Sequence, residues 1–432
     1  MQTNNTANNR LTILGLIIVQ LVGLAIISLF AYELYTDWHD DSIEIYFEYS
    51  TQFLNGEIPY RDYDMEYPPL ALLAFCIPHW LAFGQEVSLH QYIKLYLLEN
   101  ILFSLAIAST ILFLMPRWQP QARERVKPIA ILTVALIICA PLLPWRYDLF
   151  PALLTFLALY FFIAGIPTIT GFCIGIAVAA KLYPLFIIPI FGIFLIVNKD
   201  TRSLKRFILG GILSVLPLIP FFVLSPNWLN LFLSYHQHRG LEIESLFGGL
   251  ILIGQVLGLG LEYGPAKVVS NYGAFHLVSP YVNIAIRWIP YVVMFSSAIV
   301  FASCFGHFSK ERNRYGLIPT DSLVAYIVIT LLTFIATNKV FSPQYIIWVL
   351  PFVPLLRFRY ASLLIVIFSL TIMIFPIGFK LLLDIHLLGV LLLNLRNGLL
   401  VSLILWMLID FRPSLSCSKI RQFISSARCN LT

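Results

Sequence analysis

Apolar runs about as long as a membrane is thick recur along almost the whole of this chain. Hydrophobic residues make up 59% of its 432 residues and charged residues only 12%, about half the share that a soluble domain carries. A helix needs roughly 20 apolar residues to cross a bilayer. The runs therefore predict an all-α, polytopic membrane protein with the lipid bilayer as its solvent. The twelve predicted spans are 11–33, 91–115, 129–144, 148–165, 168–182, 184–197, 207–224, 282–305, 320–337, 344–356, 360–378 and 387–409.

The distribution of basic residues indicates how these spans are oriented. With the N-terminus inside and the spans alternating, 18 of the 28 Lys and Arg residues fall in inner segments, as the positive-inside rule requires. We therefore expect a plasma-membrane protein with both termini and the 116–128 and 306–319 loops in the cytoplasm. The net charge of +6 then requires no nucleic-acid partner, because cationic cytoplasmic loops account for it.

Two long outer segments divide the chain. We expect residues 1–224 to form a catalytic module with an outer loop at 34–90. Residues 225–281 would form a second outer loop, 282–410 the C-terminal transmembrane helices, and 411–432 a cytoplasmic tail. Long loops of this kind are usually functional.

Two helices are expected within the 34–90 loop. Apolar residues recur near helical spacing over 43–54, and Gly56 follows as a stop signal. This pattern predicts an amphipathic helix in the outer interface. If the stretch 69–83 were a further span, the next basic cluster would lie outside the cell. We therefore predict an interfacial helix there, broken at Pro78.

The first outer loop is unusually acidic. Nine of the 22 acidic residues fall within about thirty positions, where Arg61 is the one Lys or Arg. Such a loop is either simply solvated or provides a carboxylate site at the membrane surface. The nine acids are Asp37, Asp40, Asp41, Glu44, Glu48, Glu57, Asp62, Asp64 and Glu66.

Four short segments resemble a known family. They are Gly56-Glu57-Ile58-Pro59-Tyr60-Arg61-Asp62-Tyr63-Asp64-Met65-Glu66-Tyr67-Pro68-Pro69-Leu70, Arg146-Tyr147-Asp148, Lys181-Leu182-Tyr183-Pro184 and Asn338-Lys339-Val340-Phe341-Ser342-Pro343-Gln344-Tyr345. In this order they resemble glycosyltransferase family 87, the polyprenol-phosphate-mannose-dependent mannosyltransferases and relatives, which have the GT-C fold. The predicted layout of one span, a long outer loop and six more spans is also similar to GT-C.

The resemblance implies a reaction and its partners. A sugar, mannose or a related hexose, would pass from a polyprenyl-phosphate donor to a hydroxyl of a lipid or glycan acceptor on the extracytoplasmic face. The sequence shows no Gly-rich phosphate loop before a helix, as expected if nucleotide sugars are not the donor. We expect no cofactor, and no metal because the six cysteines include no CxxC spacing.

The acceptor hydroxyl is a weak nucleophile and needs a carboxylate base. In the family the base resembles an aspartate early in the first outer loop, four residues before a Tyr. Counting back from Tyr46 reaches Ser42, which is not an acid. We therefore predict Asp41 as the base of an inverting displacement, with Asp40 and Glu44 as alternates. The other role open to Asp41 is a helix N-terminal carboxylate stabilised by the dipole.

The leaving group is a lipid phosphate, which cationic donors stabilise. Lys181 lies in an apolar stretch, where an ionisable residue is functional by default unless it only snorkels to the interface. Arg146 either binds substrate or pairs locally with Asp148. Lys339 either contacts the phosphate or anchors the end of a span.

The other predicted substrate-binding residues come from the second outer loop and from the same motifs. His236, His238 and Arg239 would contact a phosphate or be solvated, and a metal pair is disfavoured because residues at i and i+2 do not share a helical face. The motif residues are Arg61, Asp62, Glu66, Tyr67, Asp148 and Gln344.

Two other classes of protein remain open: a secondary transporter or lipid-linked sugar flippase, and a non-catalytic membrane scaffold. Transporters often contain two related halves with a site at the midplane, and no second copy of the acidic loop is found. The discriminating observation is whether carboxylates and cations converge on one outer site or line a path through the membrane.

Overall fold

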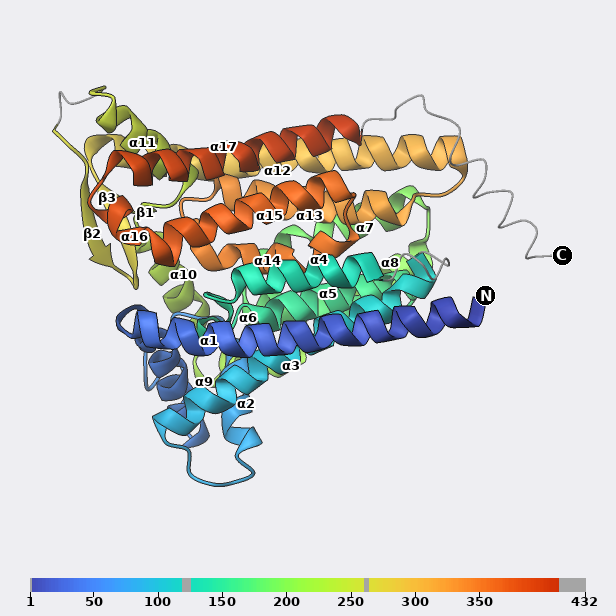
Figure 1. Cartoon of the computed structure of the whole chain (residues 1–432), viewed down its shortest axis with the longest axis horizontal. Coiled ribbons are helices and arrows are strands. Elements are labelled where there is room, and N and C mark those ends of the chain that lie inside the picture. The colour runs from blue at the N-terminus through green and yellow to red at the C-terminus, as the bar shows by residue number, and fades with distance from the viewer. Residues whose placement is uncertain (1, 119–125, 260–263, 412–432) are drawn as a thin grey trace.

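Long helices lie roughly side by side, and short helices with a small sheet gather at the end of the bundle opposite the N-terminus (Figure 1). The computed structural model describes residues 2–118, 126–259 and 264–411. The predicted cytoplasmic tail and much of the 116–128 loop lie outside these ranges. Chain order begins with α1 (Gln2–Leu54), α2 (Ala71–Leu81), α3 (Leu89–Trp118), α4 (Val126–Cys139), η2 (Leu143–Trp145), α5 (Leu149–Ile163), α6 (Pro167–Ala180), η3 (Tyr183–Phe186), α7 (Ile188–Val197), α8 (Thr201–Leu213), η4 (Leu216–Leu218) and α9 (Ile219–Leu224). It continues with α10 (Trp228–His238), β1 (Leu241–Glu242), α11 (Leu246–Val256), β2 (Lys267–Asn271), β3 (Ala274–Val278), α12 (Pro280–Tyr315), α13 (Thr320–Thr337), η6 (Pro343–Tyr345), α14 (Ile346–Val349), η7 (Leu350–Leu355), α15 (Phe358–Ile372), η8 (Met373–Ile377), α16 (Phe379–Leu383) and α17 (Leu387–Asp410).

Within the described ranges, six helical segments are long and apolar enough to cross a membrane. Shorter apolar helices, such as α4, α5 and α6, stand where further spans were predicted. The chain is therefore a polytopic membrane protein, while the count of twelve spans stays a prediction. The six segments are Leu89–Leu114, Thr201–Leu224, Pro280–Tyr315, Thr320–Thr337, Phe358–Ile377 and Leu387–Asp410.

Burial separates the central helices from those at the periphery. Nearly every residue of α13 is buried, so this helix lies at the core of the bundle. In contrast, α12 exposes large apolar side chains such as Trp288, Met294 and Phe295. An apolar helix face of this kind is stable only against lipid or another protein.

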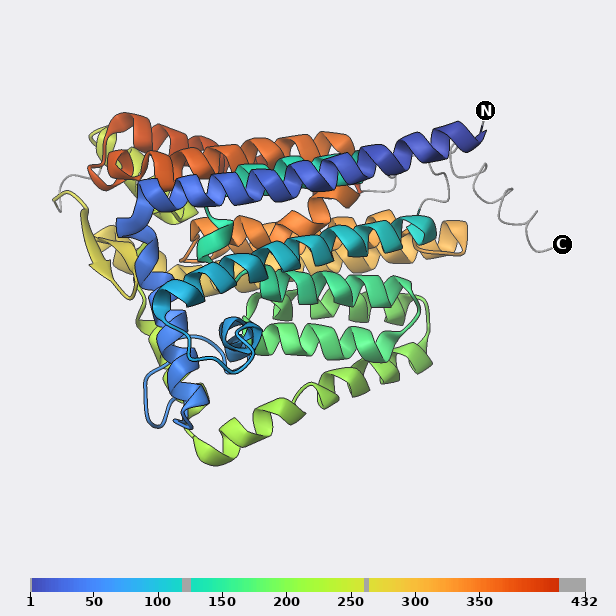
Figure 2. The ribbon, with the colours of Figure 1, turned by 60° about the horizontal axis from the view of Figure 1, so that its bottom comes forward.

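The helix predicted over 43–54 is the last part of α1, which is one helix of 53 residues. Figure 2 shows that α1 changes direction towards its C-terminal end and crosses the end of the bundle. Ile43 and Tyr46 on this segment are buried. The helix ends at Leu54, and Gly56 follows with φ +93°, a conformation that glycine adopts without strain.

One prediction about helices is wrong in detail, and one span is less regular than expected. The helix α2 runs through Pro78 without a break, because Phe75 and Cys76 are buried at its packed face and that packing outweighs the hydrogen bond lost at a proline. The predicted span 344–356 corresponds to a shorter apolar helix, Pro343–Leu355, which consists of the contiguous segments η6, α14 and η7 rather than of one regular α-helix. Its prolines at 351 and 354 remove backbone donors that a continuous helix requires.

The segment 225–281 is more ordered than a loop, and the fold is not entirely helical. It contains α10, α11 and a three-stranded antiparallel sheet in the order β1-β3-β2. Glu242 of β1 pairs with His276 of β3. Strands of two to five residues have too little alternation to be recognised in a sequence.

Glycines allow α6 and α8 to cross closely. A Cβ atom on Gly171 would lie 2.0 Å from the carbonyl oxygen of Phe207, and one on Gly210 would lie 1.9 Å from that of Thr168. Gly171 and Gly175 form the small-xxx-small spacing typical of close helix pairs in membranes. Pro217 and Pro220 then interrupt the chain after α8, and the space between these elements opens into a groove described below.

Candidate active site

A buried ion pair between Lys181 and Asp148 lies within the predicted site. Lys181 directly follows α6, and Asp148 directly precedes α5. The Lys181 Nζ lies 2.6 Å from Oδ1 of Asp148, and the Trp348 indole donates to the same oxygen at 2.5 Å. The ammonium also lies 4.6 Å from the centre of the Tyr147 ring. Exposures of 16% and 1% for the two charged side chains mean that salt screens this attraction only weakly.

Arg146 bonds to α1 rather than to Asp148. Its guanidinium donates to the hydroxyl of Ser42, the residue that stands four positions before Tyr46. The predicted local pair with Asp148 is not formed, because the Arg146 guanidinium is directed to Ser42 and Asp148 pairs with Lys181 instead. Ser42 stands at the position where the family pattern has an acid. The structure places this position next to Arg146.

The predicted bases are only partly described. Asp40 and Asp41 lie in α1, but their side chains fall outside the described part of the chain. Glu44 is exposed. The role of Asp41 therefore stays a prediction.

The charges of three cations act on His236 of α10. Burial, followed by the positive charges of Arg239, Lys181 and Lys339, lowers the pKa of His236 to about 4, against a hydrogen bond with the backbone of Glu66 that raises it. The imidazole is therefore neutral at pH 7. Arg239, Lys181 and Lys339 come from separate parts of the sequence, and all three lie near enough for their charges to act on His236. Cations grouped in this way attract an anion.

Lys339 and Arg239 belong to cross-linked segments. The Lys339 Nζ donates to the carbonyl oxygens of Gln237 and Arg239, at 3.0 and 2.6 Å. The backbone N–H of Glu242 donates to the carbonyl oxygen of Lys339 at 3.0 Å. Burial, followed by the charge of Arg239, lowers the pKa of Lys339. This ammonium thus fixes the end of α10 while it adds to the positive charge there.

Glu66 and Tyr67 lie beside this cationic group. The Tyr235 hydroxyl on α10 donates to the Glu66 carboxylate, and the Tyr60 hydroxyl donates to the Tyr67 carbonyl oxygen. The Tyr67 ring lies edge-on to Tyr147, with ring centres 5.1 Å apart. The segment Gly56–Leu70, called the motif loop below, is therefore held against the elements that carry Lys181 and His236.

Other predicted site residues have local roles. Arg61 and Asp62 pair with each other at 2.7 Å and are 50% and 32% exposed. His238 is exposed and bonds to Ser234 within α10. Gln344 accepts a hydrogen bond from Ser342 at 2.6 Å and so stabilises its own turn.

A buried charged group next to the site was not predicted from the sequence. Glu242, Glu244 and Arg396 are at most 4% exposed, and Arg239 lies 3.9 Å from Glu242. Burial raises the pKa of Glu242 and of Glu244. The polar triplet Asn394, Arg396 and Asn397 inside an apolar span was the signal that could have identified it.

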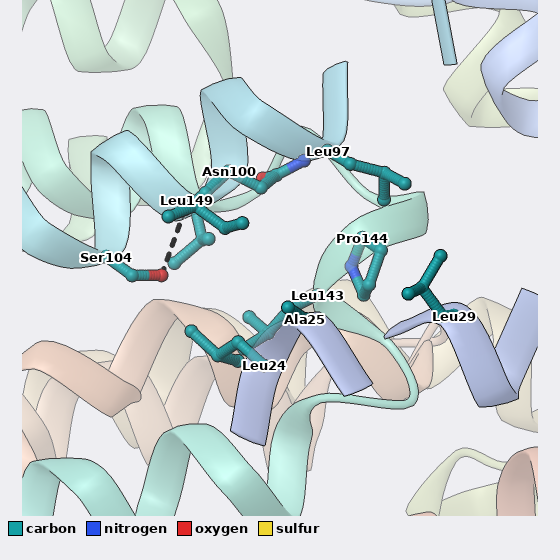
Figure 3. A pocket seen from close by; sticks show the side chains of 10 residues that line it. Leu24, Ala25, Leu29, Leu97, Asn100, Ser104, Leu143, Pro144 and Leu149 are labelled. Carbon is teal, nitrogen blue, oxygen red and sulfur yellow. Dashed lines mark hydrogen bonds between the residues drawn. The ribbon is translucent and has the colours of Figure 1, made fainter. Parts of the chain in front are cut away.

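Three cavities differ in their relation to these charges. A groove of about 430 Å³ runs between α6, α8 and α10 and is lined by Pro68, Ala179, Gly211, Trp228 and Phe232 among others. A second cavity, of about 160 Å³, lies between α1, α3 and η2, where Figure 3 shows leucine side chains on several sides. Another cavity, of about 280 Å³, is lined by Ile58, Pro59 and Leu70 of the motif loop, but of these three cavities only the groove borders both that loop and α10. Among the described residues, no group of three or more His, Cys, Asp or Glu side chains could hold a metal ion.

Together, the apolar helices and the charged group at one end define a polytopic membrane protein with a candidate site at that end. The family model of glycosyltransferase family 87 matches residues 66–334. The chain therefore belongs to glycosyltransferase family 87 and is a membrane glycosyltransferase. A search of curated proteins found no match.

Proposed function

We propose that this protein transfers a hexose, mannose or a related sugar, from a polyprenyl-phosphate donor to a hydroxyl of a lipid or glycan acceptor on the outer face of the plasma membrane. The observation that carries this proposal is the convergence of Lys181, Arg239 and Lys339 around His236, beside an apolar groove. A donor of this class has the same two parts, an anionic phosphate and a long hydrocarbon chain.

The groove and the cations are built from the same elements. Ala179 lines the groove, and Lys181 follows two residues later. Phe232 lines the groove, and its ring lies 4.5 Å from the ring of His236. A polyprenyl chain in the groove would therefore place its phosphate next to the cationic group, at the depth where lipid headgroups lie.

The cations supply the chemistry at the leaving group. When the bond between the anomeric carbon and the phosphate oxygen breaks, negative charge develops on the phosphate. Fixed positive charges in a water-poor site stabilise that charge more than water does. Lys181 is the strongest candidate, because it is an ammonium at the end of an apolar helix with the carboxylate of Asp148 to hold it in place.

A carboxylate must take the proton of the acceptor hydroxyl. Asp41 remains the proposed base, with Asp40 and Glu44 as alternates, and a single displacement with one base inverts the anomeric carbon. The bond between Arg146 and Ser42 supports this placement, because it brings the neighbouring turn of α1 towards the site.

A transporter or flippase is the alternative, and the arrangement of charges argues against it. Lys181, Arg239 and Lys339 gather around one residue, His236, rather than along a path through the bundle. Such convergence favours a reaction at a single outer site.

The test fills the groove. A Cβ on Gly211 meets nothing within 4 Å, and Gly211 lines the groove, so the side chain of Gly211→Leu starts in open space and extends into the groove. We expect the KM for a long-chain polyprenyl-phosphate sugar to rise, and the KM for a short-chain analogue to rise less. Gly192→Leu on α7 is the matched control, since Gly192 also has open space but does not line the groove. Equal KM values for Gly211→Leu and the parent would contradict the placement of the chain.

A further inference from the structure

The helix α17 carries a fully buried arginine. Arg396 is 0% exposed and lies nine residues after the start of α17 at Leu387, roughly 14 Å along the helix axis. This position is outside the residues 66–334 that match the family model. A buried charge in an apolar helix is costly and is retained where it has a partner or a function.

Arg396 contacts two loops at once. Its Nη2 donates to the carbonyl oxygen of Glu244 at 2.6 Å, and its Cζ lies 3.7 Å from the centre of the Phe341 ring. The neighbouring Asn397 donates to the carbonyl oxygen of Ser245 at 3.2 Å. This turn of α17 therefore holds the segment after β1 and the segment before η6.

Each of these segments lies close to a cation of the site in the sequence. Arg239 lies just before β1, which leads directly into Glu244 and Ser245, and Lys339 lies two residues before Phe341. They are cross-linked by the bond from the Glu242 N–H to the Lys339 carbonyl oxygen at 3.0 Å and by the Lys339 ammonium on the Arg239 carbonyl oxygen. A shift at either end of this network moves Arg239 and Lys339 together.

The charges of the network are balanced. Arg239 and Arg396 stand against Glu242 and Glu244, and all four side chains are well buried. Without Arg396, two buried carboxylates would share one nearby guanidinium. Breaking such a group strongly destabilises a protein, because an uncompensated charge is left inside it.

We propose that Arg396 is a positioning residue of the donor-phosphate site: it fixes the 239–245 and 339–341 segments, and so sets the position of Arg239 and Lys339. This inference rests on the proposed function. Arg396 does not touch the donor; it acts through the two loops.

The test separates positioning from charge balance. The hydrogen bond of Arg396 goes to the backbone carbonyl of Glu244, and its charge also acts on the Glu244 carboxyl group. Arg396→Met removes this nearby positive charge, whereas Arg396→Met combined with Glu244→Gln removes both ionisable groups. We expect the single variant to melt at a lower temperature and the double variant to regain most of the loss. The donor KM of the folded double variant should nevertheless stay raised by about tenfold, as the loss of a charge-assisted hydrogen bond implies, while the acceptor KM stays near the parent value.

Two further variants complete the set. Arg396→Lys keeps the charge but not the planar fork, so it should give a donor KM between the parent and Arg396→Met. Arg359→Met removes a different arginine, which pairs with Asp410 at 2.5 Å, and should leave the donor KM unchanged.

The outcomes are distinguishable. A folded double variant with the parent's donor KM would overturn the inference and leave the proposed function intact. A parent protein that transfers sugar from no polyprenyl-phosphate donor would overturn both.

Discussion

Removing the charge of Lys181 tests both the buried ion pair and the donor site. Lys181→Met keeps the apolar stem and deletes the ammonium. It leaves Asp148, which is 1% exposed, with one hydrogen bond from Trp348 and no other partner among the described residues for Oδ2. Breaking a buried pair in this way costs about 3–5 kcal/mol. The single variant should therefore melt at a clearly lower temperature.

The double variant Asp148→Asn with Lys181→Met separates stability from function. The Asn amide oxygen still accepts a hydrogen bond from Trp348, and no charge is left uncompensated at the pair. We expect most of the stability to return. The donor phosphate, however, has lost one cation, and the loss of a hydrogen bond to a charged group is worth about 1.5–3 kcal/mol. The donor KM should therefore rise, or kcat/KM for the donor fall, by about tenfold to 150-fold.

The assay combines thermal melting in detergent with initial rates at varied donor and acceptor concentrations. The acceptor KM should change less than the donor KM, because the ammonium acts on the leaving phosphate. Donor kinetics of the double variant that match the parent would remove Lys181 from the site and leave it a structural ion-pair partner.

Four other predictions concern the orientation, the base, His236 and the crossing of two helices. A cysteine introduced at Gln119 should not be labelled from outside intact cells; labelling would refute the proposed orientation. Asp41→Asn should lower turnover by about 10²–10⁴-fold in a folded protein, whereas a larger loss in Asp40→Asn or Glu44→Gln would reassign the base. The pKa of His236 is lowered from its ordinary 6.5 to about 4, so the unfolded state binds the extra proton first as pH drops. The free energy of unfolding should therefore fall by up to about 3 kcal/mol between about pH 6.5 and pH 4. His236→Gln should flatten that part of the melting profile, and an unchanged profile would contradict the lowered pKa. Gly171→Ala should destabilise the crossing of α6 and α8, since its Cβ would lie 2.0 Å from a backbone oxygen, whereas Gly192→Ala should not; equal melting temperatures would refute the close crossing.

Long apolar runs made the membrane class and the general helical layout predictable. They were less informative where a helix is short or interrupted, as at 344–356, because a proline's effect depends on its packing. Pro78 is accommodated within the α-helix α2, whereas the prolines at 351 and 354 lie in the 3-10 helix η7. The sheet could not be predicted because its strands are too short to show a period.

The site was predictable where a residue was unusual in its own surroundings. Lys181 stood out as a lone ammonium beside an apolar run, and in the structure it is largely buried against Asp148, while its role at the donor stays a prediction. The ion-pair partner of Lys181 was not predictable. Asp148 could pair with Arg146 or with Lys181, and tertiary packing determines which pair forms. Glu242 and Glu244 resembled ordinary residues of a solvated loop. Their burial near Arg396 depends on a helix that is distant in the sequence.

The most direct test of the central claim reconstitutes the purified protein in liposomes with a radiolabelled polyprenyl-phosphate sugar and an acceptor lipid. The account predicts that label moves from the donor into a new glycosidic bond with inverted anomeric configuration, and that nucleotide sugars do not replace the donor. Label that crosses the bilayer on the intact donor, with no new bond formed, would contradict it and favour a flippase.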